Sequence, residues 1–209
     1  MPLVTFTNPY KTLHFSIKSG DGVFIDPLAV MLLAVSASAT LLAYAVFGLA
    51  KKKKDLSSIS SIMFSLGLFD FISGFYLSFF WPLPGPYNML FGDPMLFLGL
   101  IMMSGAYAIY KNIEVKPISI VGFLLGIYLL AESYGMAAFG LERGVYFLPA
   151  FSFFIFSALS AVFSPVIYAN PKGSGKVLYY FLGVLLLLVV ISSLFIGVSS
   201  ILGHLQSPP

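Results

Sequence analysis

The sequence predicts an all-α membrane protein built as a single bundle of six transmembrane helices. Three observations support this class. Of the 209 residues, 59% are hydrophobic and only 9% are charged, and the apolar residues gather in runs long enough to cross a bilayer. A soluble domain has roughly 25% charged residues, so this chain cannot cover a water-exposed surface. We therefore expect the lipid bilayer to surround it.

Six apolar runs predict the transmembrane helices. At about 1.5 Å rise per residue, each is long enough, or nearly so, to cross a hydrocarbon core of about 30 Å. Asp26-Pro27 and Asp93-Pro94 predict the starts of the first and third helices, because an acid caps a helix and proline is favoured at its first position. Pro117 predicts the start of the fourth helix. The runs cover about residues 27–50, 56–81, 94–110, 117–139, 146–169 and 176–203.

The basic residues predict the orientation. The loops after the first, third and fifth helices contain eight lysines, whereas the other side of the membrane has only Lys11, Lys18 and Arg143. Because short cytoplasmic loops are enriched in Lys and Arg, we expect these loops in the cytoplasm and both termini outside the plasma membrane. No basic stretch precedes the first apolar run, so we expect it to be retained rather than cleaved as a signal peptide.

The segment before the first helix is not membrane-like. Residues 12–18 alternate polar and apolar side chains, which predicts a strand, and residues 3–7 could pair with it through the Asn8-Pro9 turn. The alternative is an amphipathic segment resting on the lipid headgroups. The predicted organisation is an extracytoplasmic segment with a β-hairpin (1–25), a six-span domain (26–203) and an extracytoplasmic tail (204–209).

Two acids lie deep in the apolar runs. Asp70 and Glu132 are each about 21–23 Å from the cytoplasmic helix starts, with no Lys or Arg at comparable depth. Ionisable side chains inside a membrane are functional-site candidates by default. Burial disfavours the charged form of a carboxyl group, so we expect at least one of the two to be protonated near neutral pH if they meet. Tyr128, one helical turn from Glu132, could donate a hydroxyl group.

These acids lead to the functional hypothesis that the protein binds or moves a proton, a cation or a small solute. Asp70 and Glu132 would form the titrating pair, Tyr128 would hydrogen-bond to it, and Asp93 would cap a helix at the entrance. One alternative is that each acid is permanently neutral and holds two helices together. Another is a metal or catalytic site.

Small residues predict where the second and fourth helices pack. Gly67 and Gly74, together with nearby serines, lie near the face of Asp70, so we expect close helix contact and an acid that faces protein. Gly122 and Gly126 form a small-residue pair on the fourth helix. This pair could pack against an internal neighbour or against another subunit.

Several function classes lack support in the sequence. The chain has no cysteine, hence no disulfide or thiolate site, and no complete catalytic constellation that would indicate an enzyme. Neither histidine lies within a predicted span, the eight methionines fit helix packing better than copper binding, and no cofactor is expected. The basic residues fall in short loops, so nucleic acid is not an expected partner. The runner-up function is a non-catalytic subunit anchoring a larger, possibly respiratory, membrane complex, since 22 Phe and 12 Tyr could cover partner subunits or a second copy.

The connection between the second and third helices is the most elaborate loop. Its prolines, glycines and aromatic residues from Trp81 to Pro94 predict a rigid, amphipathic cover at the membrane surface. The run Pro84-Gly-Pro-Tyr-Asn-Met-Leu-Phe-Gly-Asp-Pro94 resembles an uncharacterised prokaryotic, largely archaeal, family of integral membrane proteins with a domain of unknown function. The resemblance implies the membrane class and assigns no catalytic or binding residue.

Overall fold

The computed structural model describes residues 27–51, 56–169 and 172–206, and this part of the chain is almost entirely helical. Six helices are long and apolar enough to cross a membrane, counting α5 with its flanking 3-10 turns as one span. The hairpin predicted within residues 1–25, and Asp26, lie outside the described residues. The helices are α1 (Pro27–Ala50), α2 (Ser57–Phe80), α3 (Tyr87–Lys111), α4 (Ile118–Phe139), α5 (Phe147–Val162) and α6 (Ser174–Gln206), with 3-10 turns η2 (Gly144–Tyr146) and η3 (Ser164–Tyr168).

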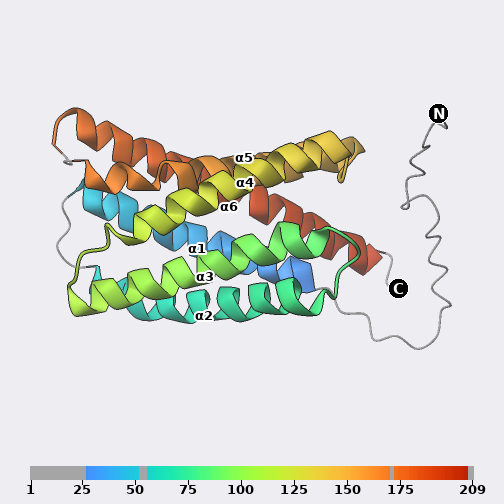
Figure 1. Cartoon of the computed structure of the whole chain (residues 1–209), viewed down its shortest axis with the longest axis horizontal. Coiled ribbons are helices and arrows are strands. Elements are labelled where there is room, and N and C mark those ends of the chain that lie inside the picture. The colour runs from blue at the N-terminus through green and yellow to red at the C-terminus, as the bar shows by residue number, and fades with distance from the viewer. Residues whose placement is uncertain (1–26, 52–55, 170–171, 207–209) are drawn as a thin grey trace, which may run out of the picture.

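The helices run side by side along the long axis of the molecule (Figure 1). The end of α1 and the start of α2, the connection 112–117, and the end of η3 and the start of α6 lie at one end, here called the lysine end. The start of α1, the end of α6 and the turns 81–86 and 140–146 lie at the other, here called the opposite end. The order of the helices therefore agrees with the predicted six-span arrangement. Which end faces the cytoplasm stays a prediction.

The bundle consists of three tightly packed helix pairs: α2 with α3, α1 with α6, and α4 with α5. The α3 and α4 helices, which are consecutive in the chain, share a much smaller contact. In Figure 1, α2 and α3 lie along one edge of the bundle, and α4, α5 and the first half of α6 lie along the other. The α2–α3 pair meets the rest of the bundle mainly through two contacts of similar, small size, α1 with α2 and α3 with α4.

Glycines permit the closest helix contact, between α2 and α3. A Cβ atom on Gly74 would lie 2.2 Å from the backbone nitrogen of Leu96, and one on Gly99 would lie 2.4 Å from the nitrogen of Phe71. Such distances would be severe overlaps, so only glycine allows these backbones to approach so closely. The predicted small-residue packing of the second helix is confirmed.

The glycine pair on α4 packs inside the molecule. A Cβ atom on Gly126 would lie 2.4 Å from the backbone nitrogen of Val162, and one on Gly122 would lie 2.7 Å from Oγ of Ser164. Both neighbours belong to the α5–η3 segment. Of the two alternatives left open by the sequence, the internal neighbour is confirmed.

The predicted start of the third helix is wrong. The α1 helix begins at Pro27 and α4 follows Pro117 as predicted, but α3 begins at Tyr87 and contains Pro94 in its interior. The side chain of Asn88 closes the preceding turn, because it accepts from the Leu83 N–H at 2.7 Å and donates to the Leu83 carbonyl. Transmembrane helices tolerate internal proline when neighbouring groups compensate. The loop is accordingly shorter than predicted, at residues 81–86.

Candidate functional site

Asp93 joins three helices near the opposite end. From its position inside α3, it accepts a hydrogen bond on each carboxylate oxygen: Ser78 of α2 donates to Oδ1 at 2.6 Å, and Tyr128 of α4 donates to Oδ2 at 2.7 Å. Both distances lie in the normal range for O–H···O hydrogen bonds. Both carboxyl oxygens of Asp93 therefore have donors from neighbouring helices.

Glu132 lies beside this group, one turn after Tyr128 on α4. Both of its carboxyl oxygens are buried, and neither makes a well-aligned hydrogen bond to a described residue. The Tyr128 hydroxyl lies close to both acids, and Asp93 is near enough to Glu132 to interact with it electrostatically. No Lys or Arg within the described residues forms an ion pair with either acid. We call Ser78, Asp93, Tyr128 and Glu132 the acid cluster.

The acid cluster contains two carboxyl groups in unequal surroundings. Asp93 has a donor on each oxygen, whereas neither oxygen of Glu132 makes a well-aligned hydrogen bond within the described part of the chain. Two carboxyl groups and two hydroxyl groups also form an all-oxygen donor set, the kind that binds hard cations. Within the described part of the chain, no three His, Cys, Asp or Glu side chains converge to form a larger metal site.

Asp70 lies elsewhere in the bundle. Its side chain is fully buried, and Ser38 of α1 donates to Oδ2 at 2.6 Å, while Oδ1 has no partner among the described residues. Asp70 therefore faces protein, as predicted. It does not face Glu132: the two acids share no hydrogen bond, and α2 and α4 are not among the packed helix pairs.

Two sequence-based expectations for the site need correction. Similar depth in the membrane suggested that Asp70 and Glu132 meet, but depth does not define neighbours, and the acid near Glu132 is Asp93. Asp93 is not a helix cap, because α3 starts two turns earlier, at Tyr87. The signal that could have placed it correctly is Pro84-Gly85-Pro86, which ends the turn and leaves residues 87–93 to continue the helix.

Six apolar helices with buried acidic side chains define a polytopic α-helical membrane protein. Within this class, the chain belongs to the family described as "Protein of unknown function (DUF981)", which matches residues 22–207. The match covers all six helices and agrees with the uncharacterised membrane family expected from the sequence. No curated protein and no solved structure matches the chain.

Proposed function

We propose that the protein binds and exchanges a proton or a monovalent cation at the acid cluster. The observation that carries this proposal is Glu132, a buried carboxyl group with no well-aligned hydrogen bond, next to an aspartate that is hydrogen-bonded on both oxygens. Ionisable groups within membrane spans are costly and characteristically serve ion or proton pathways.

The geometry supports a reversible exchange. When Asp93 is ionised, a proton on Glu132 avoids two like charges in a poorly solvated site. Loss of that proton leaves two carboxylates in proximity, which favours uptake of another proton or of a cation. Tyr128 lies close to both acids and can turn its O–H from Asp93 toward Glu132.

The acid cluster lies nearer to one end of the bundle than to the other. Glu132 is seven residues from the end of α4 and Asp93 is six residues from the start of α3, so both lie about 10 Å from the opposite end. Exchange is therefore expected with the solution at the opposite end, which is extracellular in the predicted orientation.

Proteoliposomes containing a pH-sensitive dye test the proposal. We expect the wild-type protein to pass protons, or to exchange them for Na⁺ or K⁺, and Glu132→Gln to lose this activity, because glutamine cannot titrate. Glu142→Gln is the matched control, since Glu142 accepts a hydrogen bond from Tyr87 at the opposite end and lies outside the acid cluster. Equal flux through wild type and Glu132→Gln would contradict the proposal.

The alternative function, an anchoring subunit of a larger complex, makes a different prediction. Purification in mild detergent would then recover other membrane subunits in stoichiometric amounts. A lone protein or a homo-oligomer would instead agree with an ion-binding protein that acts by itself.

A further inference from the structure

The small contact between α3 and α4 coincides with a long, partly open cavity. Its volume is about 880 Å³, and its walls come from all six helices and from η3. Along α1 it extends from Leu28 to Leu49, a distance of about 30 Å, which equals the thickness of a hydrocarbon core. A space of this length with apolar walls suits an extended hydrocarbon chain better than a compact solute.

The cavity walls are apolar along most of this length, and phenylalanine rings line the far end. Leucine, valine, alanine and methionine side chains of α1 and α3 line its middle part, among them Val35, Leu42 and Leu98. At the opposite end the ring of Phe154 lies 5.5 Å from that of Phe91 and 5.2 Å from that of Phe153, centroid to centroid. These three side chains, Phe91, Phe153 and Phe154, lie at the opposite end of the cavity and are here called the phenylalanine cluster.

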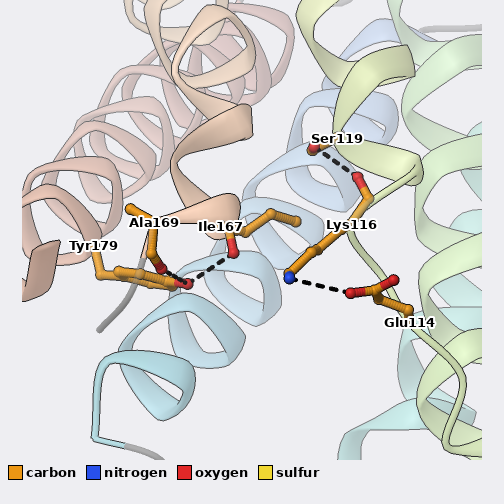
Figure 2. A network of polar contacts seen from close by, with 6 residues as sticks. All are labelled: Glu114, Lys116, Ser119, Ile167, Ala169 and Tyr179. Atoms are coloured by element: carbon orange, nitrogen blue, oxygen red, sulfur yellow. Dashed lines mark hydrogen bonds and ion pairs between the residues drawn. The ribbon is translucent and has the colours of Figure 1, made fainter. Parts of the chain in front are cut away.

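The lysine end of the cavity has a polar rim. Lys116 and Glu114 line it and form an ion pair at 3.1 Å, with side chains 41% and 65% exposed. On the other side of the rim, the Tyr179 hydroxyl donates to the carbonyl oxygens of Ile167 and Ala169 at 3.0 and 3.2 Å. Figure 2 shows both groups of contacts, and Lys116 is near enough to Tyr179 to interact with it electrostatically. One cation thus lies at the entrance of an apolar cavity.

A buried hydroxyl group marks the wall below this entrance. Ser160 lines the cavity and is 6% exposed, yet its Oγ has no hydrogen-bond partner among the described residues. Buried polar side chains are normally hydrogen-bonded, so Ser160 indicates that a polar atom belongs in the cavity beside it. Gly126 packs against the neighbouring Ala161, which places Ser160 about 12 Å inside the lysine end of α4.

We propose that this cavity binds a single-chain amphiphile with an anionic head group and an oxygen atom near the top of its chain. The head group lies at the rim, where a phosphate or carboxylate replaces Glu114 as the partner of Lys116. The oxygen accepts a hydrogen bond from Ser160, and the chain extends along α1 to the phenylalanine cluster.

Photolabelling of the whole protein in phosphatidylcholine nanodiscs tests this proposal. The probe is a lysophosphatidic acid with a diazirine near the end of its acyl chain. We expect it to label residues next to the phenylalanine cluster, such as Leu32 and Leu90, as mapped by peptide mass spectrometry. A second arm uses diacyl phosphatidylcholine with the same diazirine, and this probe should label only lipid-facing residues such as Phe79 and Ile191, which are 68% and 64% exposed.

Two variants with matched controls show whether the probe occupies the cavity. Lys116→Gln should reduce labelling about tenfold, the effect of losing one charge-assisted contact, whereas Lys176→Gln, outside the cavity lining, should not. Gly105→Leu should block the chain, since a Cβ atom at this lining position meets only the flexible Met63 side chain at 3.6 Å. Gly203→Leu, in open space on α6, is its control, and a thermal unfolding curve checks that each variant is folded.

The proposal is overturned by either of two results. One is labelling of the cavity wall that Lys116→Gln and Gly105→Leu leave unchanged. The other is labelling of the same residues by the diacyl probe with equal efficiency, which would make the occupant a tail of the surrounding bilayer lipid.

Discussion

At the scale of single residues, two buried serines of α1 form hydrogen bonds with polar side chains of the neighbouring helices. Ser36 and Ser193 of α6 share a hydrogen bond with an Oγ–Oγ distance of 2.6 Å, and Ser38 donates to Asp70 of α2 at 2.6 Å. The sequence could predict that Asp70 faces protein, because small residues share its side of the helix. It could not identify Ser38 as the partner, since periodicity within one helix does not show which helix lies opposite.

The bond from Ser38 to Asp70 should stabilise the fold measurably. Ser38→Ala removes the one donor to a fully buried carboxyl group, so we expect a loss of about 1–2 kcal/mol in the free energy of unfolding, seen as a lower Tm in detergent. The control is Ser65→Ala, because the exposed Ser65 hydroxyl bonds only to the carbonyl of Ser61 in its own helix. An equal Tm for the two variants would show that the buried hydrogen bond makes no net contribution to the free energy of unfolding.

At the scale of helices, hydropathy located all six spans and the bounds of most of them. The third was misplaced by seven residues, because Asp93-Pro94 has the chemistry of a helix start although α3 already begins at Tyr87. Because of this error the sequence predicts Asp93 to be a helix cap at the membrane surface, and a cap at the surface is not expected to contact Tyr128. The fifth helix also departs from prediction: α5 ends at Val162 and continues as the 3-10 turn η3, which contains Pro165.

The α2–α3 contact should be the most sensitive helix interface to added volume. In Gly74→Ala the new Cβ atom would meet backbone atoms of Leu96 at 2.2 and 2.6 Å, so the two helices must separate. We expect a destabilisation of at least about 2 kcal/mol, measured by thermal unfolding in detergent. Gly203→Ala makes the same exchange on α6 with no neighbouring atom within 4 Å, and this variant should match wild type. A stable Gly74→Ala would mean that the two helices are not in the close contact described.

At the scale of the whole molecule, the chain is suited to a direct test of its orientation, because it contains no cysteine. Val145→Cys would place a thiol at an 81% exposed position of the opposite end, and Ile113→Cys would place one at a 54% exposed position of the lysine end. By the distribution of lysines, a membrane-impermeant maleimide should label Val145→Cys on intact cells and Ile113→Cys only after lysis. The reverse pattern would invert the predicted topology.

The pairing of α1 with α6 also determines when the fold can be completed during synthesis. Of the six described helices, α1 is made first and α6 last, and the bond between Ser36 and Ser193 spans 157 residues of sequence. The α2–α3 and α4–α5 hairpins can each form as soon as their own two helices have entered the membrane, whereas α1 must wait until α6 has entered it. Until then Ser36 lacks Ser193 as a partner and keeps its bond to the Leu32 carbonyl of its own helix. A nascent chain that stalls after α5 therefore leaves a polar side chain uncovered in the bilayer, where a quality-control protease could recognise it.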